Sequence, residues 1–238
     1  MGRNNYFQFK HFSIIQENAA FKVGTDAVLL GSWVNISTAK TILDIGTGTG
    51  IIALMMAQRS NARITGIEIE KNAAEEATGN VKNSPWNQRV NILNTSFQDF
   101  VKAHTGVFDL IVSNPPFFTN SQKSKCNLLA LARHNDLLPH ARLVIGAVEL
   151  LERKGRLAVI LPAETSPGFI EMAENNGLHL IRQTDVKPNN RKKTNRFLME
   201  FGKIKEITEK SSLIIYDDEK PDFTDDYKWL TRDFYLNF

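Results

Sequence analysis

Residues 41–60, "TILDIGTGTGIIALMMAQRS", join an apolar run to a helical pattern through three glycines. "TILDIG" (41–46) is short and apolar, as expected of a buried strand, and "TGIIALMMAQRS" (49–60) is typical of a helix. Gly46, Gly48 and Gly50 allow a tight turn between them, where a ligand can approach backbone N–H groups at the helix N-terminus. This stretch therefore predicts the first strand, turn and helix of a nucleotide-binding α/β fold.

Short apolar runs and helical patterns alternate after this stretch. Strands are expected at 62–70, 89–93, 107–113, 156–163, 178–186 and 196–203, and helices at 71–82, 96–103, 135–155 and 167–177. Such alternation with apolar strands predicts an α/β protein with a doubly wound, mostly parallel seven-stranded sheet, covered on both faces. No helix separates the last two strands, so we expect them to form an antiparallel hairpin at one edge.

The length of 238 residues suits one domain with appendages. We expect an N-terminal cap segment (1–40), a catalytic domain (41–203) and a C-terminal tail packed on that domain (204–238). The cap segment holds one or two short strands and the pattern "VGTDAVLLGSW", which predicts a helix from about Asp26 with Thr25 as its N-cap.

The composition excludes several classes of protein. Cys126 is the only cysteine, so neither a disulfide framework nor a cysteine metal cluster is expected, and the isolated histidines predict no metal site. No apolar run approaches the roughly 18 residues of a membrane-spanning helix, and "MGRNNYFQFK" has no signal-peptide core. The net charge of +3 and the pI of 8.9 are compatible with a polyanionic partner without requiring one. We expect a cytoplasmic monomer.

Two acids flank the glycine turn. Glu68 ends the second strand, where nucleotide-binding folds hold a ribose. Gly48, Gly50 and Ala53 also satisfy the dinucleotide pattern of a dehydrogenase. However, Asp44 would repel a pyrophosphate and instead suits a ligand with a positively charged amino acid moiety, such as S-adenosylmethionine. The alternative is a plain strand–helix turn in which Asp44 hydrogen-bonds the loop.

"SNPPFF" (113–118) follows the fourth strand. The first and fourth strands flank the point where strand order reverses, so this segment and the glycine loop should meet in one crevice. The Asn114 side-chain carbonyl and the Pro115 main-chain carbonyl can accept the two N–H groups of an exocyclic amine. Pro115 and Pro116 fix the backbone, and Phe117 offers a stacking face for a base. The alternative is a tight turn with core phenylalanines.

These motifs resemble those of known enzymes. "LDIGTGTG", "IEIE" and "NPPFF" are similar to the motifs of class I S-adenosylmethionine-dependent methyltransferases that methylate amino groups. "FKVGTDAVLLGSW", "ARH" (132–134) and "RFLMEF" narrow the resemblance to the bacterial family that methylates N6 of adenine-37, beside the anticodon of a valine tRNA. The resemblance covers nearly the whole chain and implies a tRNA substrate.

The resemblance also implies site residues. The cofactor-binding set is Thr25, Asp44, Gly46, Gly48, Gly50, Glu68, Ser96, Phe97 and Asn114. The catalytic set is Asn114, Pro115, Pro116 and Phe117, and the RNA-binding set is Phe118, Arg133, His134, Arg191, Lys192, Lys193 and Arg196. Two positions depart from the usual pattern. Ser96, with Phe97 beside the adenine ring, stands where relatives often carry an acid, and Phe117 stands where they often carry Tyr.

The segment "KPNNRKKTNR" (187–196) is expected to be the loop of the edge hairpin. Its cations either grip RNA phosphates or belong to a solvated loop, and both interpretations remain open. Other functions are also open. They are N2-methylation of guanine in ribosomal RNA, N5-methylation of glutamine in a protein, and non-catalytic nucleotide binding.

Overall fold

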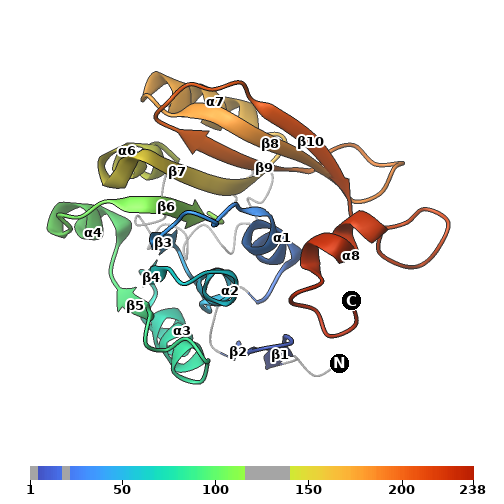
Figure 1. Ribbon diagram of the computed structural model, residues 1–238, viewed down its shortest axis with the longest axis horizontal. Helices are drawn as coiled ribbons and strands as arrows, with labels where there is room; N and C mark the ends of the chain where they lie inside the picture. Colours follow the sequence, from blue (N-terminus) through green and yellow to red (C-terminus); the bar gives the residue numbers. More distant parts are fainter. Residues whose placement is uncertain (1–4, 18–21, 116–139) are drawn as a thin grey trace, which may run out of the picture.

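Residues 5–17, 22–115 and 140–238 are described by the computed structural model of the chain (Figure 1). The strands are β1 (Tyr6–Gln8), β2 (Ser13–Ile15), β3 (Thr41–Ile45), β4 (Arg63–Glu68), β5 (Val90–Asn94), β6 (Phe108–Ser113), β7 (Leu151–Pro162), β8 (His179–Lys187), β9 (Arg196–Gly202) and β10 (Glu209–Ile214). The helices are α1 (Thr25–Trp33), α2 (Ile51–Arg59), α3 (Lys71–Lys82), α4 (Phe97–Ala103), α6 (His140–Leu150), α7 (Ser166–Asn175) and α8 (Asp225–Thr231).

The main sheet has the strand order β10-β8-β9-β7-β6-β3-β4-β5. Strands β3 to β7 are mutually parallel, and β9 runs antiparallel to both of its neighbours, β7 and β8. The chain winds outward from β3 through β4 to β5 and then returns to place β6 on the other side of β3. This reversal confirms the predicted doubly wound sheet and places the carboxyl ends of β3 and β6 side by side.

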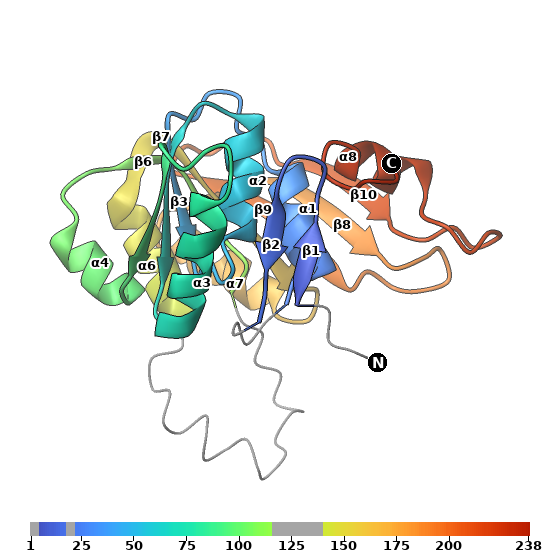
Figure 2. The same ribbon diagram turned by 90° about the horizontal axis from the view of Figure 1, so that it is seen from below.

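Each central strand alternates its side chains between two cores. Ile42 and Leu110 belong to one core, whereas Leu43 and Ile111, which follow them on β3 and β6, belong to the other. The first core contains residues of α1, α2 and α3, and the second contains residues of α4, α6 and α7. Figures 1 and 2 show these two helical layers on opposite faces of the sheet. Apolar strands are needed because both faces are buried.

The seven expected strands are all present, and an eighth, β10, extends the sheet. It pairs in parallel with β8 and covers the outer side of the predicted β8–β9 hairpin. Farther along the tail, Tyr227 and Phe234 are each 1% exposed within the first core. The Lys10 N–H donates to the Phe234 carbonyl at 2.8 Å, so the tail also contacts the segment after β1. The proposed division at residues 40 and 203 stays a prediction.

Two predicted helix boundaries are wrong. Helix α6 ends at Leu150 rather than at Gly155, because Leu151 already pairs with Phe108 of β6. Sheet pairing overrides the helical propensity of the following residues. Helix α1 begins at Thr25, and its N-cap is Gly24, which has no side chain to cap the helix.

Gly146 permits the close packing of α6 on α4. A Cβ added at Gly146 would lie 2.5 Å from Cε1 of Phe97, which is itself only 6% exposed. Gly146→Ala should therefore lower the free energy of unfolding by about 1–3 kcal/mol through overpacking. In contrast, a Cβ at Gly79 of α3 meets no atom within 4 Å. Gly79→Ala should stabilise the protein by about 0.5–1 kcal/mol. Urea denaturation of both variants checks this, and equal effects would contradict the packing account.

Candidate active site

The glycine loop between β3 and α2 has a backbone that only glycine adopts easily. Gly46, Gly48 and Gly50 have φ values of 69°, 56° and 82°. The N–H groups of Gly46 and Thr47 both donate to the Ile67 carbonyl at 3.0 Å, which fastens the loop to the end of β4. A Cβ at Gly46 or Gly48 would find no described atom within 4 Å. The backbone of the loop therefore faces space that a ligand can enter.

Asp44 lies beneath this loop with 0% of its surface exposed. Its Oδ2 atom accepts from the Thr47 hydroxyl at 2.6 Å and from the Ala53 N–H at 3.1 Å. Its Oδ1 atom is buried and has no hydrogen-bond partner among the described residues. Burial raises the pKa of Asp44 to about 7, although both hydrogen bonds act to lower it. A nearby positive charge would favour the ionised form and would satisfy the unpartnered oxygen.

Glu68 ends β4 beside the same loop. Its Oε2 atom accepts from the Gly48 N–H at 2.9 Å, and its Oε1 atom accepts from the Glu70 N–H at 3.0 Å. Glu70 in turn caps α3, because its carboxylate accepts from the Ala73 N–H at 3.0 Å. These bonds hold the Glu68 carboxylate at the mouth of the glycine loop, as expected of a group that binds ribose hydroxyls.

Asn114 follows β6 directly beside this site. Ser113 is in register with Ile45, and its hydroxyl donates to the Ile45 carbonyl at 2.9 Å. The loops after β3 and β6 therefore start together, as predicted. The Asn114 Oδ1 atom is buried and has no hydrogen-bond partner among the described residues, and Pro115 is buried. A buried acceptor without a partner is costly in free energy, and a ligand donor would remove that cost. The predicted role of Asn114 stays a prediction.

Part of the predicted site falls outside the described residues. Pro116, Phe117, Phe118, Arg133 and His134 all lie in the segment 116–139, so their predicted roles stay predictions.

The serine that was expected to replace an acid has a structural role. Ser96 is the N-cap of α4: its Oγ atom accepts from the Asp99 N–H at 3.0 Å and donates to the Asp99 carboxylate at 2.7 Å. Phe97 packs in the second core against Gly146. Their predicted contacts with the adenine ring stay predictions, and the ring of Phe97 has little surface left for such a contact.

The basic hairpin loop lies at the same end of the sheet as the glycine loop. Arg196 begins β9 in register with Pro162, the last residue of β7, a strand that runs parallel to β3. Its Nε atom is 2.9 Å from Oδ2 of Asp26, next to the exposed Thr25. Arg191 lies 3.8 Å from Asp218. Two of the four predicted RNA-binding cations in this loop are thus paired with acids, whereas Lys192 and Lys193 are exposed.

Two residues that hold the glycine loop in place were not predicted from the sequence. Thr47 lies inside the glycine motif itself, and its hydroxyl reaches Asp44. Asn80 of α3 is 2% exposed and bonds the carbonyls of Ile15 and Thr49 at 2.9 Å, so it connects β2 to the glycine loop. The only feature of the sequence that could have pointed to Asn80 is an Asn in the middle of a predicted helix, where this residue is unfavourable.

The described residues contain no group of three or more His, Cys, Asp or Glu that could hold a metal ion. Within the same part of the chain, no helix is long and apolar enough to cross a membrane.

Comparison with known proteins gives the family. A family model described as "Methyltransferase small domain" matches residues 19–166. The tRNA1(Val) (adenine(37)-N6)-methyltransferase of Trichodesmium erythraeum is 46% identical over 98% of this chain and 99% of its own length. The enzyme of the same name from Phocaeicola vulgatus is 42% identical over the same shares. The chain belongs to the tRNA1(Val) (adenine(37)-N6)-methyltransferase family. The resemblance inferred from the motifs is therefore confirmed.

Solved structures from outside this family share the fold. A predicted O-methyltransferase from Agrobacterium tumefaciens superimposes with a TM-score of 0.71 at 19% identity and covers 88% of this chain and 96% of its own. A ribosomal protein L11 methylase from Lactobacillus delbrueckii subsp. bulgaricus gives a TM-score of 0.58 at 15% identity, with 82% and 98% covered. At these identities the likeness supports the methyltransferase fold.

The raised pKa of Asp44 predicts a pH-dependent stability. The folded protein keeps this proton up to about pH 7, whereas the unfolded chain releases it near pH 3.9. The folded state therefore binds more protons between these values. Its free energy of unfolding should fall by about 1.4 kcal/mol per pH unit as pH rises toward 7, and should then level off.

Asp44→Asn removes this contribution while it keeps the shape of the side chain. Urea denaturation between pH 5 and 8 should show the stability difference between wild type and Asp44→Asn changing with pH up to about 7. Parallel curves for the two proteins would contradict the assignment.

Proposed function

We propose that this protein transfers a methyl group from S-adenosylmethionine to N6 of adenine-37, beside the anticodon of a valine tRNA. The near full-length match to relatives of that name carries the proposal. The buried Asn114 acceptor next to the glycine loop supports it chemically.

The residues around the glycine loop fit S-adenosylmethionine. This cofactor supplies a methyl group on a positively charged sulfonium when it is bound. Gly46 and Gly48 expose backbone to the ligand, and Glu68 stands where ribose hydroxyls need acceptors. The buried, unpartnered Oδ1 of Asp44 matches the positive charge of an amino acid moiety. A pyrophosphate, as in a dinucleotide, would place negative charge beside this carboxylate instead.

Asn114 and Pro115 act on the nucleophile. The amine at C6 of adenine is a weak nucleophile because its lone pair is delocalised into the ring. The Asn114 side-chain carbonyl and the Pro115 main-chain carbonyl accept its two N–H groups and orient it. The same oxygens stabilise the positive charge that develops on the nitrogen as it gains a further substituent. The proline fixes the backbone, so these acceptors are placed before the substrate arrives.

The RNA is held at the same end of the sheet. Lys192 and Lys193 are exposed in the loop between β8 and β9, and Arg191 and Arg196 reach acids of the protein itself. We assign phosphate contacts to the two lysines first, because an exposed cation can neutralise a phosphate without breaking an internal ion pair. The solvated-loop interpretation remains the alternative.

The comparisons favour adenine over the other amines. Both relatives named above carry the adenine-37 name at 42% and 46% identity along almost the whole chain. Neither relative carries a name that refers to guanine in ribosomal RNA, glutamine in a protein, or non-catalytic binding.

Incubation of the protein with S-adenosylmethionine and unmodified valine tRNA tests the function. Mass spectrometry of the digested nucleosides should detect N6-methyladenosine, and a tRNA with guanine at position 37 should remain unmethylated. Methylation of guanine, or of a protein substrate alone, would overturn the proposal.

Asn114→Ala should lower kcat about a hundredfold, because it removes one acceptor from a buried site. Calorimetry should find cofactor affinity within a fewfold of wild type, since Asp44 and Glu68 are unchanged. Asn87→Ala is the matched control: Asn87 is exposed beyond α3 and should leave kcat unaltered. A kcat of Asn114→Ala within threefold of wild type would refute the role assigned to Asn114.

A further inference from the structure

A second concave region lies away from the candidate active site. It holds a cavity of about 760 Å³ between the sheet, α1 and α8, and Arg59 connects it to a neighbouring cavity of about 720 Å³. We treat these two neighbouring cavities as one region. We call it the arginine groove, after Arg59, Arg156 and Arg182 in its lining.

The strand register places the arginine groove at the opposite end of the sheet. Arg156 is in register with Leu110 near the start of β6, whereas Asn114 follows the end of β6. Asn35, which also lines the groove, precedes β3, whereas the glycine loop follows β3. Four residues of extended strand, or about 13 Å, separate the level of Arg156 from Asn114.

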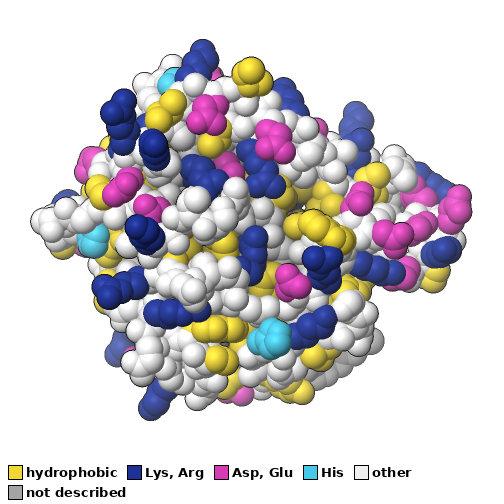
Figure 3. Space-filling model, in the orientation of Figure 1, with side chains coloured by type: hydrophobic (Ala, Val, Ile, Leu, Met, Phe, Trp, Pro, Cys, Tyr) yellow, Lys and Arg dark blue, Asp and Glu magenta, His cyan; other side chains and the backbone are white. Residues whose placement is uncertain are grey.

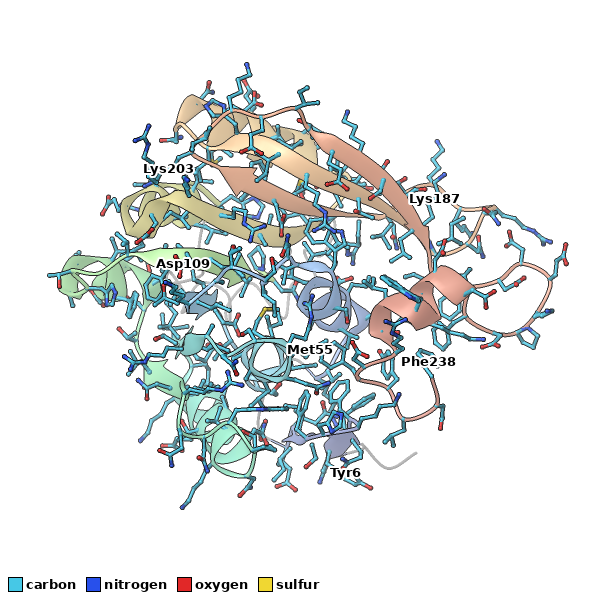
Figure 4. All side chains as sticks on the ribbon, in the orientation of Figure 1. Tyr6, Met55, Asp109, Lys187, Lys203 and Phe238 are labelled. Carbon is cyan, nitrogen blue, oxygen red and sulfur yellow. The ribbon has the colours of Figure 1, made fainter. Side chains whose placement is uncertain are left out.

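Positive charge gathers in this groove. The larger cavity is lined by three acids (Glu200, Glu206 and Glu209) and by six cations (Arg59, Arg153, Lys154, Arg156, Arg182 and Lys203). The lining of this cavity therefore carries three more cations than acids, an excess equal to the net charge of the whole chain, +3. Figure 3 shows many Lys and Arg side chains over the corresponding face, and Figure 4 labels Lys203 on it. A concave surface with a net positive charge attracts a polyanion.

A buried carboxylate organises the guanidinium groups. Glu200 of β9 is 2% exposed and accepts from the Asn35 N–H at 3.0 Å. Its Oε2 atom lies 3.6 Å from Arg156 and 3.7 Å from Arg182. Arg182 also lies over the ring of Trp33, 4.0 Å from the ring centroid. One carboxylate thus positions two guanidiniums and leaves an unbalanced positive charge in the groove.

The rim of the arginine groove carries exposed side chains that do not stabilise the fold. Arg153 and Lys154, early in β7, are exposed and make no hydrogen bond or ion pair with any described residue. Trp229 of α8 is 65% exposed, and the Arg232 guanidinium lies 4.7 Å from its ring centroid. Free cations beside an exposed aromatic ring are typical of surfaces that bind a nucleic acid strand.

We propose that the arginine groove binds the phosphate backbone of the tRNA substrate, as a second contact away from the glycine loop and Asn114. The proposal rests on the proposed function, which supplies the polyanion. Two neighbouring cavities lined by several cations suit a chain of phosphates better than a single small anion.

The test is Arg153→Gln combined with Lys154→Gln, measured by fluorescence anisotropy without cofactor at several salt concentrations. Full-length valine tRNA should bind several-fold more weakly, and the log–log salt slope should flatten by roughly 0.7–0.9 for each lost phosphate contact. The matched control is Lys82→Gln with Lys102→Gln, which removes the same charge from exposed positions on α3 and α4 outside the groove.

Several results would overturn the proposal. They are an unchanged salt slope with full-length tRNA, or an equal loss of affinity in the control pair. Binding of inorganic phosphate or adenosine monophosphate that depends on Arg153 and Lys154, with tRNA binding unaltered, would show a small-anion site instead. Because binding is measured without methyl transfer, failure of adenine-37 methylation with a flattened slope would reject the proposed function and leave the groove intact.

Discussion

The carboxylate of Asp44 sits in a fully buried position beneath the glycine loop, and the cofactor end of the fold depends on it. One oxygen holds the Thr47 hydroxyl and the Ala53 N–H, so strand β3, the loop and the first turn of α2 share one anchor. The other oxygen has no hydrogen-bond partner among the described residues. Because desolvation outweighs the hydrogen bonds, the pKa of the group rises to about 7. A buried carboxylate of this kind is costly unless it is compensated, and the cationic ligand that we propose would compensate it.

The reversal of strand order between β3 and β6 brings a second loop beside the Asp44 anchor. Two parallel neighbours end at the same level, and the Ser113 hydroxyl ties them by its bond to the Ile45 carbonyl. The glycine loop and Asn114, to which we assign the cofactor and the amine, therefore start side by side. Neither loop needs to be long for the two to meet, since the strand order has already brought them together.

The two ends of the sheet carry opposite chemistry. Acceptors gather at the carboxyl ends of the parallel strands, where Asp44, Glu68 and Asn114 converge. Guanidiniums gather at the amino ends around Glu200. The β8–β9 hairpin reaches both ends, because Arg182 and Glu200 lie near one end and the basic loop lies at the other. The β8–β9 hairpin thus carries cations at two places along the sheet where we propose RNA contacts.

The sequence by itself determined the features that depend on neighbouring residues. Apolar runs and helical periodicity specify a parallel sheet, and the glycines require the tight turn, since other residues rarely adopt positive φ. Glu68 and Asn114 were found because strand ends in this fold always face the same crevice.

Only the tertiary structure decided what depends on distant partners. Arg196 is tied to Asp26 across 170 positions, and Ser96 caps helix α4. Pairing of Leu151 with β6 ends α6 five residues earlier than its own sequence indicates. The arginine groove combines residues of α1, α2, β7, β8, β9 and α8. No spacing along the chain encodes such contacts, because ion pairs, strand register and burial are selected by packing after the local elements have formed.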